Sequence, residues 1–212
     1  MVTGPDLTLL HTSPAHVPVF DALRDRSHPG AALRHLVVPQ LLERARAEGP
    51  EAVAPAVREA LVEAGPGPVL VTCSTIGATA EALATELGVP VLRVDRPMAA
   101  VAVRTGVRIA VLATVESTLA PTVELLAQEA GAEPLAIRAH LVDGAWERFE
   151  AGDTAGYLAR VAAVADSVAD ADVIVLAQAS MAGAAELVRT RIPVLSSPAP
   201  GLAAGLRQVA AS

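Results

Sequence analysis

The chain has 212 residues, of which 52% are hydrophobic and 2% aromatic, and its formal net charge is −7. This length suits one large α/β domain or two smaller lobes, and the apolar content is enough for a sizeable aliphatic core. The negative charge, with acidic and basic residues interspersed, argues against binding to a phosphate backbone, so we expect no nucleic-acid partner.

Short apolar runs alternate with longer segments rich in alanine, leucine, glutamate and arginine. The predicted strands are Leu7–Leu10, Leu33–Val38, Val69–Thr72, Val91–Val94, Arg108–Ala113, Leu135–Ala139, Asp172–Ala177 and Val194–Ser196. The predicted helices are Val17–Arg26, Pro50–Ala64, Ile76–Leu87, Arg96–Thr105, Thr118–Gly131, Thr154–Ala169 and Met181–Arg189. Continuously apolar strands that alternate with helices are typical of α/β folds, in which parallel sheets are covered by helices on both faces.

The sequence also repeats itself. The segment Val69–Leu92 resembles Val173–Leu195, and the segment that begins at Leu7 matches more weakly the one that begins at Ile109. Both matches have nearly the same offset, about half the chain, which indicates two related lobes. The alternative is that any two strand–helix units look alike in a sequence rich in alanine and valine.

The repeat predicts a first lobe of residues 1–97 plus 196–212 and a second lobe of residues 98–195. Ligands bind beyond the carboxyl ends of parallel strands, so we expect the active site in a cleft between the lobes. The loops that follow these strands are rich in hydroxyl groups, and each precedes a predicted helix. Helix N-termini and hydroxyl donors suit a ligand that carries a carboxylate.

The sequence contains no lysine, which excludes a lysine Schiff base and a P-loop lysine. No glycine-rich dinucleotide fingerprint follows a strand, and the histidine spacing is poor for zinc, so we expect neither a cofactor nor a metal. The single cysteine fits a reducing compartment. The N-terminus does not resemble a secretory signal and the apolar runs have the length of strands, so we expect a cytoplasmic protein without membrane association.

Cys73 is the residue on which the chemistry depends. It lies between an apolar strand and a predicted helix, and a helix N-terminus lowers the pKa of a thiol. The alternative is that Cys73 is a small buried hydrophobic residue. Other site residues have structural alternatives too: Thr114, Ser117 or Thr118 can cap a helix. We expect Trp146 and Tyr157 to pack a helix outside the cleft.

At these motifs the chain resembles the aspartate/glutamate/hydantoin racemase superfamily, whose members include maleate isomerase and arylmalonate decarboxylase. The resemblance implies two pseudo-symmetric α/β lobes and cofactor-independent catalysis, in which two cysteines remove and return a Cα proton. Cys73-Ser74-Thr75 matches the first cysteine motif, and His11-Thr12 falls where glutamate racemases carry Asp-Ser. Gln178-Ala179-Ser180 falls on the second cysteine motif, with Gln178 in place of the thiol.

The resemblance implies an isomerase or racemase that acts next to a carboxylate or carbonyl group of a small acid, with Cys73 as acid and base. The implied substrate-binding residues are His11, Thr12, Ser74, Thr75, Thr114, Ser117, Thr118, Gln178, Ala179 and Ser180. Three chemistries stay open: racemisation with His11 as the second base, isomerisation of an unsaturated diacid by thiolate addition, and decarboxylation of a malonate-type acid. A non-catalytic carboxylate-binding protein is a further alternative. We also expect a homo-oligomer.

Overall fold

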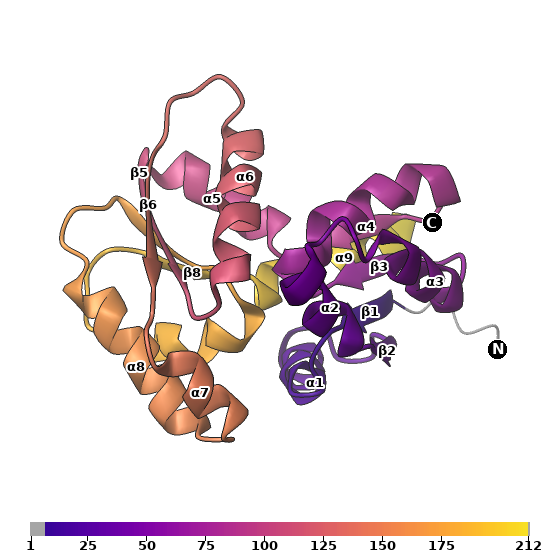
Figure 1. Ribbon diagram of the computed structural model, residues 1–212, viewed down its shortest axis with the longest axis horizontal. Helices are drawn as coiled ribbons and strands as arrows, with labels where there is room; N and C mark the ends of the chain where they lie inside the picture. Colours follow the sequence, from indigo (N-terminus) through magenta and orange to yellow (C-terminus); the bar gives the residue numbers. More distant parts are fainter. Residues whose placement is uncertain (1–6, 212) are drawn as a thin grey trace. The chain divides into compact units, whose positions relative to one another are not determined.

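The computed structural model describes residues 7–211, and the chain divides into two compact units. Unit 1 contains the residues up to Val94 and those from Pro198 onward, and unit 2 contains Asp95–Ser197. Each unit is built on one four-stranded sheet in which all neighbouring strands are parallel. Helices flank each sheet, as Figure 1 shows.

The sheet of unit 1 has the strand order β2-β1-β3-β4. Its strands are β1 (Leu7–His11), β2 (Leu33–Val37), β3 (Val69–Val71) and β4 (Val91–Arg93). Its helices are α1 (His16–Ser27), α2 (Gln40–Glu48), α3 (Ala54–Ala64), α4 (Ser74–Leu87) and α9 (Pro198–Ala211).

Alternate residues of the central strands pack on opposite faces of this sheet, as the two-residue period of a strand requires. Leu10 and Val71 belong to the apolar cluster that α2, α3 and α4 form on one face. Leu9 and Leu70 belong to the cluster on the other face, with Phe20 of α1 and Leu202 of α9. The side chains of β1 and β3 are buried on both faces, which explains why β3 is entirely apolar and why leucine predominates in β1.

The sheet of unit 2 has the order β6-β5-β7-β8, which is the order of unit 1 with each strand replaced by its counterpart. Its strands are β5 (Arg108–Ala113), β6 (Ala136–Leu141), β7 (Val173–Leu176) and β8 (Val194–Ser196). Its helices are α5 (Arg96–Thr105), α6 (Leu119–Ala130), α7 (Ala145–Glu150) and α8 (Thr154–Ser167), with the 3-10 helices η1 (Glu116–Thr118) and η2 (Ala179–Glu186).

Unit 2 also buries both faces of its central strands. Leu112 and Leu176 pack with Tyr157 of α8 on one face. On the other face, Val111 and its neighbours pack against Leu125 of α6 and residues of α5. The aliphatic cores that the composition predicts are therefore present in both units.

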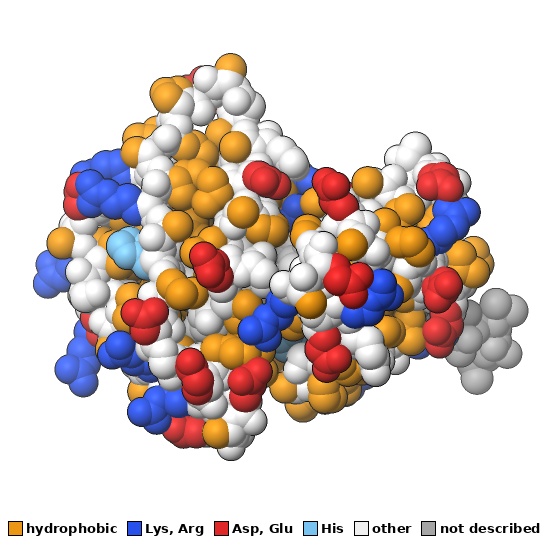
Figure 2. All heavy atoms as spheres, in the orientation of Figure 1, with side chains coloured by type: hydrophobic (Ala, Val, Ile, Leu, Met, Phe, Trp, Pro, Cys, Tyr) orange, Lys and Arg blue, Asp and Glu red, His pale blue; other side chains and the backbone are white. Residues whose placement is uncertain are grey.

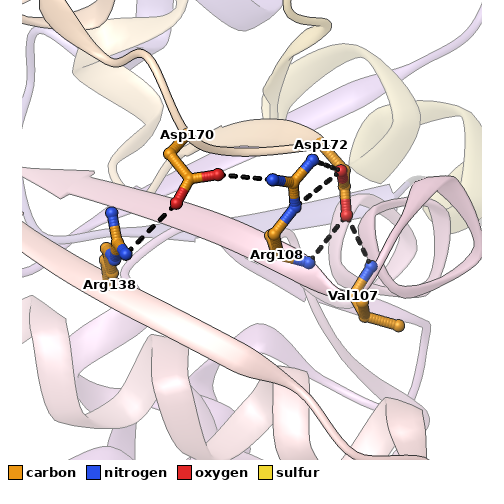
Figure 3. Close-up of polar contacts among 5 residues, drawn as sticks. All are labelled: Val107, Arg108, Arg138, Asp170 and Asp172. Atoms are coloured by element: carbon orange, nitrogen blue, oxygen red, sulfur yellow. Dashed lines mark hydrogen bonds and ion pairs between the residues drawn. The ribbon is translucent and has the colours of Figure 1, made fainter.

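An ionic cluster holds the starts of two strands of unit 2 together (Figure 3). One carboxylate oxygen of Asp172, just before β7, accepts hydrogen bonds from the backbone N–H groups of Val107 and Arg108 at 3.1 and 2.9 Å. The other oxygen accepts from the Arg108 guanidinium, which also contacts Asp170. Asp170 pairs with Arg138 of β6 at 3.2 Å. Asp172 thus binds both the backbone and the side chain at the start of β5.

The α/β fold and all eight strands that the sequence predicts are confirmed. The helices need corrections. The predicted helix over Met181–Arg189 is the 3-10 helix η2, and the helix predicted from Pro50 begins at Ala54. The connection that contains η2 is shorter than its counterpart in unit 1.

Charged side chains of both signs are intermixed on the face drawn in Figure 2. Within residues 7–211, the helices are too short or too polar for any of them to cross a membrane.

Candidate functional site

Cys73 lies at the carboxyl end of β3 and is the N-cap residue of α4, with an extended backbone (φ −114°, ψ 114°). Its side chain is buried, and burial raises the pKa of the thiol above its ordinary value. Several hydrogen bonds act in the opposite direction and lower this pKa: those of the Thr12 and Thr75 hydroxyls and of the backbone at Ile76 and Thr75. The sulfur therefore lies among donors that suit a negative charge, in a site whose burial favours the neutral thiol.

His11, the last residue of β1, is fully buried and uses both ring nitrogens within the protein. Its Nδ1 lies 2.8 Å from Oγ1 of Thr72, and its Nε2 lies 2.8 Å from Nδ1 of His35. Burial first, and then the neighbouring His16 and His35, lower the pKa of His11 to about 3. His11 is therefore uncharged at neutral pH, and in this arrangement neither of its nitrogens is open to a ligand.

A second buried histidine, His16, begins α1. Its ring lies edge-on to that of His11, with 6.0 Å between the centroids. Burial lowers the pKa of His16 to about 4, and its Nδ1 has no hydrogen-bond partner among the described residues. The loop that carries Thr12 is thus bounded by two uncharged imidazoles.

In unit 2, Gln178 is the N-cap residue of η2, with a similar backbone (φ −121°, ψ 141°). Its side-chain oxygen accepts two hydrogen bonds from Thr114, one from the backbone N–H at 2.6 Å and one from the hydroxyl at 2.9 Å. An amide whose oxygen is engaged in this way has its NH₂ group left to donate. Gln178 therefore offers hydrogen-bond donors where a thiol would offer acid–base chemistry.

The backbone bonds of the sheets show that Gln178 holds in unit 2 the position that Cys73 holds in unit 1. The N–H of Thr72 donates to the carbonyl of Leu10 at 3.0 Å. In the other sheet the N–H of Ala177 donates to the carbonyl of Leu112, at 2.9 Å. Thr72 and Ala177 are thus equivalent, and so are the residues that follow them.

The loops after the first strand of each sheet are equivalent in the same way. The carbonyl of His11 accepts from Val38 N–H, and the carbonyl of Ala113 accepts from Val142 N–H, both at 2.8 Å. Thr12 and Thr114 follow these two residues. Thr12 contacts the Cys73 sulfur and Thr114 contacts the Gln178 amide, so each unit pairs a threonine with its N-cap residue.

Tyr157 is a residue that the sequence analysis missed. We expected it to pack a helix outside the site, and its ring is indeed buried in the core of unit 2. Its hydroxyl, however, lies 2.8 Å from Oγ of Ser180 and 3.5 Å from Oγ1 of Thr114. The tyrosine thus connects two of the predicted site residues, and no local sequence motif marks this contact.

The other predicted residues lie in the same strand-end loops. Ser74 and Thr75 form the first turn of α4 and are buried, and Ala179 is buried at the start of η2. Ser117 has a buried hydroxyl without a partner among the described residues. Thr118 is the N-cap residue of α6, but its side chain makes no capping bond. Within residues 7–211, no group of three or more histidine, cysteine or acidic side chains is arranged to hold a metal ion.

Comparison with known proteins identifies a family that matches most of the chain. A family model described as Asp/Glu/hydantoin racemase matches residues 21–204. No curated protein sequence matches significantly.

Among solved structures, allantoin racemase from Klebsiella pneumoniae is 19% identical, with a TM-score of 0.66 over 98% of this chain and 88% of that one. Picrophilus torridus aspartate racemase is 16% identical, with a TM-score of 0.70 over 98% and 95%. A mutant of arylmalonate decarboxylase in a liganded form is 22% identical, with a TM-score of 0.58 over 97% and 92%. These structural likenesses show a shared fold.

Proposed function

The chain belongs to the Asp/Glu/hydantoin racemase family, and on that premise we propose that it is a cofactor-independent enzyme acting on a small acid. The reaction takes place at the carbon next to a carboxylate or carbonyl group, and Cys73 moves the proton. The observation that carries the proposal is the environment of Cys73: an N-cap sulfur with the Thr12 and Thr75 hydroxyls and the first amides of α4 around it.

Proton transfer at such a carbon passes through an enolate, whose charge has to be met by donors already in place. The donors around Cys73 bond the sulfur itself, so they stabilise the negative charge on the thiolate form. Because burial raises the pKa of Cys73, the resting form is the thiol, which is the form that donates a proton. Removal of a proton requires the thiolate, which these same donors stabilise.

Gln178 supports chemistry in which a single thiol acts. An amide is not a useful base near neutral pH, so racemisation by two cysteines is not available to this chain. The bonded oxygen of Gln178 leaves its NH₂ group to bind an acceptor, such as a carboxylate oxygen of the substrate. The substitute base considered from the sequence, His11, has both nitrogens engaged.

A second candidate within the same family is decarboxylation of a malonate-type acid, which Gln178 favours because one proton donor is sufficient. The bond between Cα and one carboxyl carbon breaks, carbon dioxide leaves, and the electron pair stays on the enolate. The Cys73 thiol then protonates Cα, and water restores the proton on sulfur. Isomerisation of an unsaturated diacid would begin from the thiolate, the form that burial of Cys73 disfavours.

The proposal includes a small carboxylate-bearing substrate, a homo-oligomeric assembly and a reducing cytoplasmic setting in which the lone cysteine stays a thiol. Incubation of amino acids, hydantoins and substituted malonates with the protein in deuterated water tests it. Deuterium at Cα, followed by NMR, supports proton transfer, and release of carbon dioxide from malonates supports the decarboxylase. Binding of an acid without either signal would instead support a carboxylate-binding protein.

A further inference from the structure

The polar residues behind Cys73 form a continuous chain that the proposed chemistry does not use. Thr72, His11, His35 and Asp21 are linked in this order, from the buried end of β3 to the surface of α1, and we call them the histidine chain. We infer that the histidine chain positions Cys73. It joins His11 to Thr72, and the residues that follow these two, Thr12 and Cys73, contact each other.

The hydrogen-bond geometry fixes the order of the protons in the chain. The Thr72 hydroxyl donates its one hydrogen to the carbonyl of Leu10 at 3.1 Å, so it accepts from Nδ1 of His11. His11 is neutral, so its Nε2 carries a lone pair and accepts from Nδ1 of His35. His35 Nε2 lies 3.4 Å from a carboxylate oxygen of Asp21, at the partly exposed end of the chain.

The ion pair between Asp21 and Arg24, at the far end of the histidine chain, lies away from the thiol. The neutral His11 is at the buried end, while His35 meets Asp21 at the partly exposed end, where Asp21 also pairs with Arg24 at 3.0 Å. The neighbouring His16 is uncharged at neutral pH as well. Cys73 is therefore not activated by an imidazolium partner, and its reactivity depends on how well the hydroxyl and amide donors are placed.

The hydrogen bond between His11 and Thr72 lies next to the contact between Thr12 and Cys73. His11 directly precedes Thr12, and Thr72 directly precedes Cys73. The bond of 2.8 Å between His11 and Thr72 joins the ends of β1 and β3, so it limits how far the Thr12 hydroxyl can move from the sulfur.

Unit 2 shows that the fold itself does not need this chain. By the strand register, His11, Thr72 and His35 are equivalent to Ala113, Ala177 and Ala139. Ala113 and Ala177 belong to an apolar cluster. The equivalent positions of the two sheets are thus polar in the unit that carries the thiol and apolar in the unit that carries Gln178.

The test uses alkylation of the unliganded protein by iodoacetamide, read by mass spectrometry, because Cys73 is the only thiol. Thr72→Val removes the hydroxyl at nearly constant shape, and Thr72→Ser keeps it. We expect Thr72→Val to react about tenfold more slowly at fixed pH, the equivalent of one hydrogen bond to a charged group. Thr72→Ser should react like the natural protein. An unchanged or faster rate in Thr72→Val overturns the inference.

A second pair of variants keeps the test decisive if Thr72→Val does not fold. His35→Asn retains a donor for His11 and should preserve the rate, whereas His35→Leu removes it and should slow alkylation. His28→Asn, a histidine outside the chain, is the control and should have no effect.

Nitrogen NMR of the histidine rings gives an independent readout. We expect His11 to be neutral with its hydrogen on Nδ1, while hydrogen on Nε2 of His11 overturns the assignment. The inference rests on the proposed function only for the role of the thiol in catalysis, because the alkylation and NMR tests need no turnover. A missing turnover with the expected alkylation and NMR results would therefore count against the proposed function alone.

Discussion

At the scale of single residues, Cys73 combines two opposing influences. Burial raises the pKa of its thiol, and hydrogen bonds from Thr12 and the first turn of α4 lower it, with burial the larger influence. The balance gives a thiol that is protonated at rest but surrounded by groups that can receive a negative charge. A residue of this kind suits a reaction in which the proton is handed over only when a substrate is bound.

The raised pKa of Cys73 predicts the pH dependence of its reactivity. Only the thiolate is alkylated, so the rate should be low at neutral pH and should still rise with pH above the ordinary thiol range. Rates of alkylation across a pH series, with Cys73→Ser as the blank, check this. A rate that is already at its plateau near neutral pH would mean that the hydrogen bonds outweigh burial.

We expect a substitution at Gln178 to weaken ligand binding without changing the stability of the fold. Gln178→Glu keeps an oxygen that accepts from Thr114, but it replaces the NH₂ donor with a second, negatively charged acceptor. We expect carboxylate ligands to bind at least about tenfold more weakly, because a charge-assisted hydrogen bond is replaced by repulsion. The melting temperature should change little. Titration calorimetry and thermal unfolding of the two proteins measure this, and unaltered affinity would contradict the donor role.

The contacts of Thr72 and Tyr157 could not be predicted from the sequence. Cys73 was recognisable because an apolar strand, a cysteine and a helical segment follow one another in the sequence. The bond between His11 and Thr72 joins residues 61 positions apart, and the contact of Tyr157 with Ser180 joins residues 23 apart. Such contacts depend on strand register and helix packing, which no local pattern fixes.

At the scale of elements, the first turn of α4 depends on a glycine. A Cβ at Gly77 would lie 2.7 Å from Nε of Arg93 and 3.1 Å from its Cγ and Cδ atoms. Arg93, at the end of β4, is almost fully buried, so its side chain has little room to move. The close approach of β4 to α4 therefore requires glycine at this position.

Gly77→Ala should consequently destabilise the protein by about 1–3 kcal/mol, the usual range for overpacking a core. Urea unfolding measures the change, and Ala78→Ser, at the exposed neighbouring position, is the control that should remain close to the natural protein. Equal stability of Gly77→Ala and the natural protein would show that Arg93 can be displaced at low cost.

The cluster at the start of β5 makes a second prediction at this scale. The Asp172 pKa is lowered, first by the hydrogen bond from the Arg108 side chain and then by that from the Arg108 backbone. A carboxyl group with a lowered folded-state pKa stabilises the fold above its unfolded pKa, and this contribution is lost as the pH falls through the folded value. The stability deficit of Asp172→Ala should therefore shrink on acidification.

The matched control for Asp172→Ala is Asp170→Ala. Asp170 pairs with the side chains of Arg108 and Arg138, whereas Asp172 also accepts two backbone N–H bonds (Figure 3). Thermal unfolding at neutral pH should show the larger loss for Asp172→Ala. Equal losses would mean that the backbone bonds contribute nothing beyond the ion pairs.

The sequence was reliable for strands and less so for the connections. Apolar runs located the central strands β3, β5 and β7, because strands buried on both faces leave that pattern, and the alternation with helical segments located the others. Helices α7 and α9 were not predicted, only Arg44–Glu48 of α2 was interpreted as helical, and η2 was predicted as an α-helix. The sequence does not distinguish an α-helix from a 3-10 helix in a short alanine-rich segment such as Ala179–Glu186.

At the scale of the whole molecule, two sheets with the same strand order carry different chemistry. One unit has a thiol supported by a polar chain, and the other has an amide supported by Thr114. The fold follows from family membership. The two units differ at the equivalent N-cap positions, which are Cys73 in one and Gln178 in the other.

This asymmetry predicts a stereochemical outcome. With one proton-moving group, Cα should exchange its hydrogen in one enantiomer of a substrate acid without conversion to the other. Incubation of each pure enantiomer in deuterated water, followed by chiral chromatography and mass spectrometry, checks this. Inversion at the rate of exchange would require a second base, which the described arrangement of His11 and Gln178 does not provide.

The most direct test of the account is deuterium incorporation at Cα of a substrate acid by the natural protein and by Cys73→Ala under identical conditions. The account predicts incorporation by the natural protein and a loss on the order of 10²–10⁴-fold in Cys73→Ala, the usual contribution of a positioned acid or base. Circular dichroism should show that both proteins are folded. Undiminished incorporation by Cys73→Ala would contradict the central claim that this sulfur moves the proton.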